Sequence, residues 1–502
     1  FVLTGANTGT LSGKTTGWSQ IENLTGGAGA DTFTFDDNAT LSGAADGDGG
    51  TDVLDFSAYT SDVAFSVTGV GSLDGIAGTG VPITNGFDNM NTFSLPSGGG
   101  SDTLTINGTS GDDVISVGPG TIGLGAIAVS VAGVESIVVN GGDGSDTLSV
   151  DFASSNPIPS GGLTFNGQDG TTDSMEFLAG VGFTTVTYVF TNAADGTVSF
   201  DGSTLTYTGL EPITDNLVVA NRVFTFGALA DSITLAAGTV NDGISEIASP
   251  TAETVAFLNP TSSLTINTGT GADSLGGMLD SAGGVAFALP ISVNAGADLT
   301  LNEMATAGDL SVTSAASIAV DQVSVGPAAT LTLSAAGAIA GVDAADDVAD
   351  VTAGHVVVDA ATSFGEGANT LDIDADDTNI TASGNVTFDV VGTGGHAVTV
   401  DLSAGNVLVD GRNEAADGGF EAITLTSVDT ADGTVDVFNY ANGITATLVD
   451  NADTDKDVRL ETVSSGDISI DQILANSAAD VALDAAGAIA GVDAADDVAD
   501  VT

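Results

Sequence analysis

The chain has no cysteine and only five basic side chains among its 502 residues. Without cysteine it cannot be held together by disulfides, and its redox compartment cannot be read from cysteine usage. Its 67 acidic residues give a net charge of −62, which excludes nucleic acid as a natural partner because the phosphates would be repelled. The same charge argues against docking on an anionic membrane. The five bases are Lys14, Arg222, Arg412, Lys456 and Arg459.

Helical periodicity, membrane-length apolar runs and a signal peptide are also lacking. The best helix candidate, Asp343–Asp350, has little apolar face, and we interpret it as a lateral loop or a single short turn. Acidic disorder is excluded as well, because 42% of the residues are apolar and lie in alternating patches. The chain opens with Phe1 inside repeat-like sequence, so we interpret it as a segment of a longer protein.

Short triplets of alternating apolar residues recur along the chain. Leu310–Val312 and Leu331–Leu333 start 21 residues apart, which suits one coil of a β-helix made of short strands and turns. An 18-residue block at Ala335–Thr352 is repeated without change at Ala485–Thr502. The pattern predicts an all-β parallel β-helix, or β-solenoid, with coils of about 20 residues and very little helix. The more aromatic stretch Phe183–Asn216 indicates either wider coils or a small β-sandwich-like insertion.

Glycine and aspartate recur together in the turns. Gly26–Thr34 and Gly141–Ser149 both fit the nonapeptide G-G-x-G-x-D-x-U-x, where U is a large apolar residue. Its glycines suit a tight turn with positive φ, and its Asp offers oxygen to a hard cation. Variants with one early glycine replaced lie at Gly47–Asp55, Ser97–Thr105, Gly108–Ser116 and Thr268–Gly276.

The aspartates of these six motifs are candidate calcium ligands. They are Asp31, Asp52, Asp102, Asp113, Asp146 and Asp273. The alternative is that each caps its own turn by accepting backbone N–H groups. In a solenoid Asp31 and Asp52 would stack on adjacent coils. Several strands end in asparagine, which forms hydrogen-bonded ladders when stacked; these residues are Asn107, Asn140, Asn166 and Asn267.

Two resemblances follow from these motifs. Residues 1–280 resemble the RTX, or haemolysin-type, calcium-binding repeats of secreted bacterial proteins, through Gly26–Thr34 and Gly141–Ser149. Residues 281–502, with Leu331–Gly337 and its relatives, look like the Ala-rich coils of filamentous-haemagglutinin-type adhesins. RTX arrays run their nonapeptides consecutively, whereas the copies here are scattered, so we expect fewer complete shared calcium sites than in such an array. The resemblance implies two β-solenoid domains with these bounds, calcium as a cofactor and an extracellular or cell-surface location in a bacterium.

Catalysis finds little support in the sequence. β-Helix polysaccharide lyases need bases and cations near an acidic sugar, whereas the five bases here are scattered. His355 and His396 are single histidines that we expect at the surface or in turns. Pairs such as Asp346-Asp347 carry little information among 67 acids.

The sequence therefore predicts a non-enzymatic, structural segment of a long bacterial surface adhesin or matrix fibre. Its expected partners are further copies or further coils in a filament, and cell-surface or matrix polysaccharide. Two alternatives stay open: a tandem β-sandwich S-layer or adhesin protein of a salt-adapted organism, and a β-helix polysaccharide-active enzyme.

Overall fold

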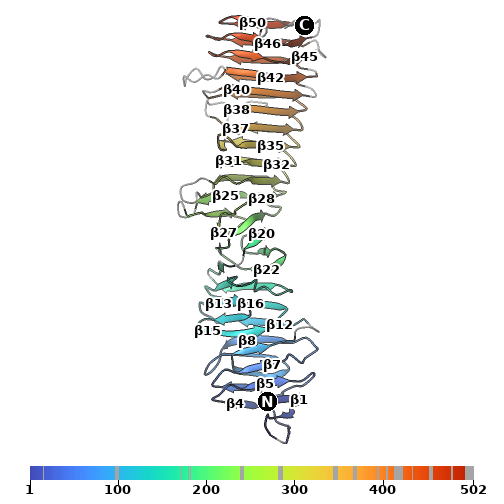
Figure 1. Ribbon diagram of the computed structural model, residues 1–502, viewed down its shortest axis with the longest axis vertical. Helices are drawn as coiled ribbons and strands as arrows, with labels where there is room; N and C mark the ends of the chain where they lie inside the picture. Colours follow the sequence, from blue (N-terminus) through green and yellow to red (C-terminus); the bar gives the residue numbers. More distant parts are fainter. Residues whose placement is uncertain are drawn as a thin grey trace. The chain divides into compact units, whose positions relative to one another are not determined.

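The described part of the chain is built from β-strands, from β1 (Val2–Gly5) to β50 (Ile489–Gly491), and it contains no helix that could cross a membrane (Figure 1). The computed structural model describes residues 1–491, except residues 15, 97–100, 171, 179, 181, 238–241, 281–286, 343–348, 366–369, 393–394, 403–404, 412–421, 432, 452–455 and 476–478. The expectation of an all-β chain with very low helix content is confirmed. Most of the helix candidate Asp343–Asp350, the pair Asp346-Asp347 and Arg412 lie outside the described residues.

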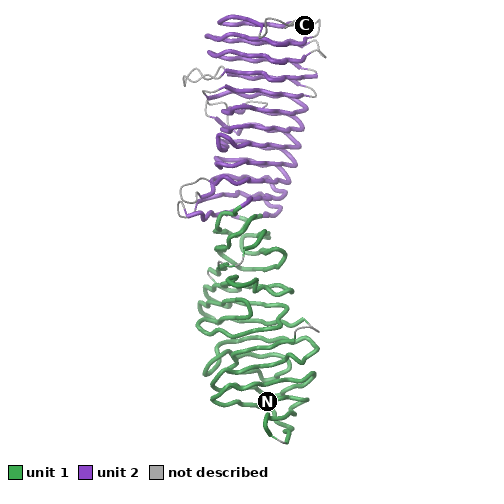
Figure 2. The backbone as a smooth tube through the Cα atoms, viewed as in Figure 1, with its two compact units in different colours: residues 1–223, 251–261 green, residues 224–250, 262–502 purple. Residues whose placement is uncertain are grey.

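The chain divides into two compact units (Figure 2). Unit 1 comprises Phe1–Val223 and Thr251–Thr261, and unit 2 comprises Phe224–Pro250 and Ser262–Thr502. The sequence-based boundary near residue 280 reflects a change in the composition of the turns. It does not coincide with the boundary between these two units.

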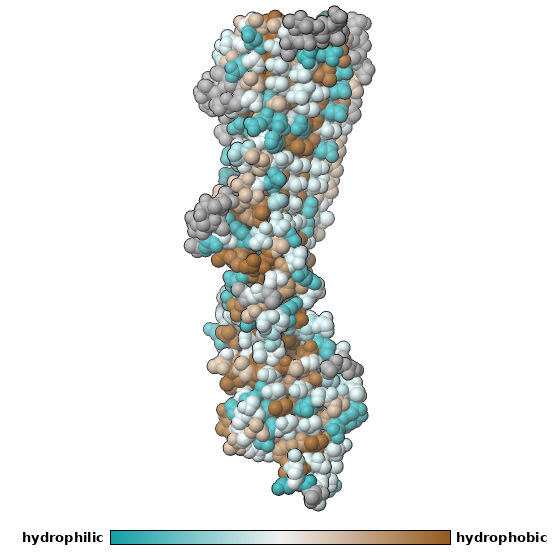
Figure 3. Space-filling view, in the orientation of Figure 1, coloured by the Kyte–Doolittle hydropathy of each residue, from teal (hydrophilic) through white to brown (hydrophobic). Residues whose placement is uncertain are grey.

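Alternation of apolar and small polar residues decides which side of each strand is buried. In β35 (Thr330–Ala335) the side chains of Leu331 and Leu333 are completely buried, while Thr330 and Thr332 are partly exposed. The same pattern occurs in β12 (Thr103–Asn107), where Leu104 and Ile106 are buried. Successive side chains of a strand point to opposite faces, so each triplet contributes one or two residues to a narrow core. Outward residues are mixed in hydropathy on the visible face (Figure 3).

Parallel pairing links most strands of unit 2 to a strand one coil further along the chain, although β25 (Ser232–Ala237) and β26 (Ile244–Ser249) pair antiparallel. β30 (Ile291–Ala295) pairs with β32 (Leu310–Ser314), which pairs with β35 in turn, and Leu310 lies directly opposite Leu331. The 21-residue spacing read from the sequence is thus one coil of a long, mostly parallel sheet. Apolar side chains from successive coils stack on one another, which is the packing of a repeat architecture.

Unit 1 has longer coils because antiparallel excursions interrupt the parallel pattern. The aromatic stretch forms β20 (Phe183–Phe190), β21 (Gly196–Phe200) and β22 (Ser203–Thr208), paired antiparallel in order, before β22 returns to parallel pairing with β18 (Leu163–Gly170). The stretch expected to form wider coils or a small β-sandwich-like insertion is thus an antiparallel three-stranded excursion from the mostly parallel sheet. Similar excursions occur at β8 to β10 (Ala64–Val70, Ile76–Val81, Ile83–Met90) and at β13 to β15 (Val114–Gly118, Thr121–Leu124, Ile127–Ala132).

Stacked asparagines follow the strands as expected. The side-chain amide of Asn140 donates to Asn107 at 2.8 Å, and that of Asn166 donates to Asn140 at 2.8 Å. In unit 2, Asn294 donates to Asn267 at 2.9 Å. Each amide serves as donor and acceptor at once, so the ladders join coils at the ends of their strands.

Candidate functional site

The candidate aspartates lie where strands begin, and carboxylates of successive coils contact one another's backbone. Asp31 precedes β5 (Thr32–Phe35) and Asp52 precedes β7 (Val53–Asp55), with Thr32 opposite Val53. The Asp31 N–H donates to Oδ1 of Asp52 at 2.8 Å, and the Asp52 N–H donates to Asn91 at 2.8 Å. The expected stacking of Asp31 on Asp52 is confirmed.

A second column of the same kind runs through Asp113, Asp146 and Asp173. The Asp113 N–H donates to Oδ1 of Asp146 at 2.8 Å, and the Asp146 N–H donates to Oδ1 of Asp173 at 2.9 Å. We call Asp31–Asp52–Asn91 and Asp113–Asp146–Asp173 the aspartate columns. Sequence analysis missed Asp173, because a six-residue spacing from Gly167, instead of five, takes it out of the nonapeptide pattern.

The remaining candidates use the same geometry outside the columns. Oδ1 of Asp102 accepts the Val63 N–H at 2.7 Å, and the Asp102 N–H donates to Glu135 at 3.0 Å. In unit 2, Oδ1 of Asp273 accepts the Asp231 N–H at 2.9 Å. One carboxylate oxygen therefore joins two coils in four of the six candidates, Asp52, Asp102, Asp146 and Asp273. The carboxylates of Asp31 and Asp113 accept hydrogen bonds from their own turns instead.

The hydrogen bonds of Oδ2, the second carboxylate oxygen, separate five of the six candidates into two groups. In Asp31 it accepts the Gly27 N–H at 2.8 Å, in Asp113 it accepts the N–H and hydroxyl of Thr109, and in Asp273 it accepts the Thr268 hydroxyl at 2.6 Å. These three carboxylates cap their own turns, which is the alternative weighed for them. Such bonds use lone pairs that a cation would otherwise take.

Asp52 and Asp146 differ, because each is fully buried and its Oδ2 has no hydrogen-bond partner among the described residues. A Cβ added to Gly141 would lie 2.4 Å from Oδ2 of Asp146 and 2.8 Å from the Gly167 carbonyl oxygen. Desolvation raises the pKa of both carboxyls, and the neighbouring aspartates raise it further. A buried carboxylate oxygen without a hydrogen-bond donor is stabilised either by a proton or by a bound cation.

The glycines of the motif act differently from the expectation. Gly142 and Gly144 have positive φ values of 114° and 122°, but no glycine of Gly26–Thr34 does. What the two nonapeptides share is the first glycine, whose missing side chain leaves room for the carboxylate five residues later. A Cβ at Gly26 would lie 2.6 Å from Oδ2 of Asp31. In both copies, the motif therefore allows a carboxylate to pack closely against the backbone. Only the copy at Gly141–Ser149 also has glycines with positive φ.

Within the described residues, no group of three or more histidine and acidic side chains is arranged to hold a metal ion. Calcium would therefore depend on backbone carbonyl oxygens together with one or two carboxylates. Calcium accepts such mixed oxygen ligands, and the unpartnered oxygens of Asp52 and Asp146 fit that donor chemistry.

A buried polar network in unit 1 was not anticipated from the sequence. Arg222, counted above as one of five scattered bases, is completely buried and pairs with Asp215, which also accepts the Tyr188 hydroxyl. Glu253 is 3% exposed; its Oε1 accepts the Thr254 N–H at 2.9 Å and its Oε2 has no partner. Desolvation raises the pKa of Glu253 to about 8. The sequence did hold a signal for the burial of Glu253. In β27 (Ala252–Leu258) it falls on the same side of the strand as the buried Val255 and Phe257.

The histidines form no catalytic constellation. His355 is half exposed and its Nδ1 lies 2.6 Å from Asp377, as expected for a surface residue. The expectation was wrong for His396, which is buried and contacts the Thr378 hydroxyl at 2.8 Å. It lies in β40 (Gly395–Leu402), where the alternation places it on the same buried side as Val398 and Val400.

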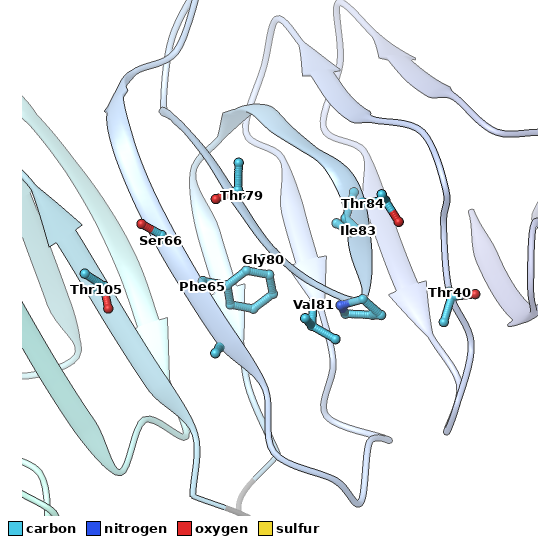
Figure 4. A pocket seen from close by; sticks show the side chains of 11 residues that line it. Thr40, Phe65, Ser66, Thr79, Gly80, Val81, Ile83, Thr84 and Thr105 are labelled. Atoms are coloured by element: carbon cyan, nitrogen blue, oxygen red, sulfur yellow. The ribbon is translucent and has the colours of Figure 1, made fainter.

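A groove of about 700 Å³ lies on unit 1 beside the β8–β10 excursion (Figure 4). Its lining includes the ring of Phe65, the side chains of Val81 and Ile83, and the hydroxyls of Thr79 and Thr105. None of its lining residues titrates near neutral pH, so the groove provides no acid–base pair.

Comparison with known protein families finds none that matches the chain, and no curated protein matches it.

Proposed function

We propose that this chain is a structural segment of an extracellular bacterial surface adhesin or matrix fibre, wound as a parallel β-helix. The observation that carries the proposal is the stacking of strands. In each unit, strands of successive coils pair in register and are joined by side-chain hydrogen bonds as well as by backbone hydrogen bonds. Such stacking distributes load along the coil axis. Cell-surface or matrix polysaccharide is the proposed partner of the outward faces.

The mostly parallel pairing favours this architecture over the tandem β-sandwich alternative, whose sheets would be antiparallel. The enzyme alternative gains nothing from the groove, because its lining has no titratable residue. Electron microscopy in calcium tests the mechanical role. Thin, uniform rods or filaments support it, whereas globular particles at every calcium concentration would contradict it.

Calcium is proposed to bind the aspartate columns at Asp52 and Asp146, with backbone carbonyl oxygens of neighbouring coils. Bound calcium would replace the proton that the buried oxygen otherwise needs and would offset the repulsion between stacked carboxylates. Export would precede folding, since low cytoplasmic calcium leaves the net charge of −62 uncompensated.

Asp146→Asn tests the calcium proposal. The amide oxygen can still accept the Asp113 N–H, and the neutral amide N–H₂ replaces the buried, unpartnered Oδ2, so without calcium the variant should melt at a higher temperature than the parent. Calcium should raise the melting temperature of the parent by mass action but should raise that of the variant less. The control is Asp143→Asn, which removes a charge from an exposed position of the same turn. Equal calcium responses in all three proteins would rule Asp146 out as a ligand.

A further inference from the structure

The carboxylate oxygen of Asp52 that has no hydrogen bond approaches a backbone carbonyl oxygen of another coil. A Cβ built on Gly47 would lie 2.4 Å from Oδ2 of Asp52 and 2.4 Å from the Asn89 carbonyl oxygen. Two acceptors therefore come close to the same point, and no donor among the described residues serves Oδ2. Asp52 is 0% exposed, so bulk water does not supply the missing donor. A proton or a cation has to stabilise such an oxygen.

A second carboxylate with an unpartnered oxygen belongs to the same part of unit 1. Asp74 lies in the loop between β8 and β9, outside the glycine–aspartate motifs of the sequence. Its Oδ2 accepts the N–H of Gly50, two residues before Asp52, at 3.2 Å. Its Oδ1 is buried and has no hydrogen-bond partner among the described residues. Burial raises the pKa of Asp52, and the charges of Asp31, Asp74 and Asp46 raise it further, so the Asp74 carboxyl is near enough to act on that of Asp52.

Asn89 connects the Asp74 loop to the coil that carries Asp52. Asn89 is 1% exposed, and its Oδ1 accepts the N–H groups of Leu73 at 2.7 Å and of Asp74 at 3.3 Å. Its Nδ2 donates to Oδ1 of Asp46 at 2.8 Å. Its φ is 58°, a left-handed conformation that asparagine adopts more readily than most residues. One residue thus holds the loop with its side chain and presents its carbonyl oxygen towards Asp52.

We propose that Asp52, Asp74 and the Asn89 carbonyl oxygen together bind one calcium ion. All three supply hard oxygen ligands, and calcium accepts such ligands in irregular arrangements completed by water, whereas magnesium requires a near-ideal octahedron. The inference rests on the proposed calcium binding of the aspartate columns and deepens it, because it adds a ligand from outside the columns.

The second charge distinguishes this site from the one proposed at Asp146. The column neighbours of Asp146 are Asp113 and Asp173, and neither has a buried oxygen without a partner. Calcium affinity rises with the number of charged ligands, so the Asp52–Asp74 site should bind calcium more tightly than the Asp146 site.

Bound calcium would also fix the loop between β8 and β9. Without the ion, the loop depends on the Gly50 and Asn89 hydrogen bonds, while the carboxylates of Asp52 and Asp74 repel each other. With the ion, both carboxylates contact the same charge. Hydrogen exchange of the Leu73 amide, which donates to Asn89, therefore reports on occupancy of the site.

Asp74→Asn tests the proposal by calorimetric titration of the full chain with calcium chloride. The amide oxygen can still accept the Gly50 N–H, so we expect the variant to fold. The parent should bind calcium in more than one class of affinity, and the variant should weaken the tightest class by about tenfold or more. Calcium should protect the Leu73 amide in the parent but not in the variant. The control is Asp36→Asn, which removes a charge from an exposed position of unit 1 and should behave as the parent.

Thermal melts separate ligation from simple capping of the loop. Without calcium, Asp74→Asn should melt no lower than the parent, because it removes a charge that acts on Asp52. In calcium the order should reverse, since the parent gains more from the bound ion. If Asp74 only capped the Gly50 N–H, the difference between the two proteins would be the same at every calcium concentration, which would contradict the proposal.

Equal calcium affinity and equal Leu73 protection in the parent and Asp74→Asn would overturn the proposal. If Asp52→Asn still weakened binding in that case, Asp52 would bind calcium without Asp74, and the proposed calcium binding of the columns would stand. A parent that binds no calcium at millimolar concentration would remove both this site and the calcium sites of the columns. The proposed structural role would then depend on the electron microscopy alone.

Discussion

Glu253→Gln should remove a pH-dependent weakness from unit 1. The pKa of Glu253 is raised from 4.5 to about 8, first by desolvation and also by the charge of Glu211. In the folded state the carboxyl therefore stays protonated where the unfolded chain has already ionised. Its contribution to stability is present below pH 4.5 and is lost as pH rises from there to about 8.

The magnitude follows from the shift. Each unit of pKa difference is worth about 1.4 kcal/mol, so the displacement from 4.5 to about 8 corresponds to about 5 kcal/mol at pH 9. Some relaxation of the site on ionisation reduces this, and we expect glutamine to stabilise the opening of unit 1 by about 2–5 kcal/mol at pH 9. At pH 4 the two side chains are both neutral and the difference should be close to zero.

Native-state hydrogen exchange of amides in β20 to β23 (Phe183–Phe190 to Ile213–Asp215) measures the free energy of local opening directly. Amides of unit 2 provide an internal reference, and Glu22→Gln provides a matched variant at an exposed carboxyl of unit 1. Tyr207, whose raised pKa reflects burial first and Glu253 second, must stay protonated over the range used. If parent and Glu253→Gln open with parallel pH profiles between pH 5 and 9, then Glu253 ionises freely in the folded chain and the reasoning fails.

Three further predictions concern stacking. Gly141→Ala should lower the free energy of unfolding by about 1–3 kcal/mol, because its Cβ would meet Asp146, whereas Gly29→Ala, with no atom within 4 Å of its Cβ, should change stability little in thermal melts. Ile339→Ala should cost about 2–5 kcal/mol in denaturant titrations of unit 2, because Ile339 is completely buried; a neutral result would mean that its side chain does not contribute to the stacked core. Asn140→Ala should cost about 1–3 kcal/mol, since it leaves the Asn166 amide without its acceptor, and a neutral result would show that the ladder is dispensable.

Alternation and spacing were sufficient for the strands and for their stacking. Leu331 and Leu333 are buried because a period of two fixes which side faces the core, and Asp31 meets Asp52 because their spacing equals one coil. Both features depend only on residues near in sequence or one coil away. Such local information is present in a single sequence.

The excursions could not be obtained in the same way. β20 to β22 alternate like the parallel strands, and a period of two does not say whether a partner runs parallel or antiparallel. Burial of Arg222 and Glu253 was missed for a related reason. Charged residues are assigned to the surface unless a partner is known, and Asp215, Tyr188 and the Leu258 carbonyl come from other strands or turns.

The nonapeptide illustrates the limit of motif reading in chemical terms. Calcium ligation and turn capping both require a carboxylate held close to backbone, so both select the first glycine and the aspartate five residues later. The two functions diverge only at the second carboxylate oxygen. Thr109 supplies two donors to that oxygen in Asp113, whereas the corresponding oxygen of Asp146 has none.

Stacking then makes that one oxygen important for the stability of unit 1. Asp146 lies between Asp113 and Asp173 in its column, and both neighbours raise its pKa. Carboxylates on adjacent strands are about 4.8 Å apart, where like charges repel strongly once water is excluded. A proton and a calcium ion relieve that repulsion at the same atom and therefore compete. The calcium response of Asp146→Asn therefore distinguishes whether a proton or a cation relieves the repulsion in this column.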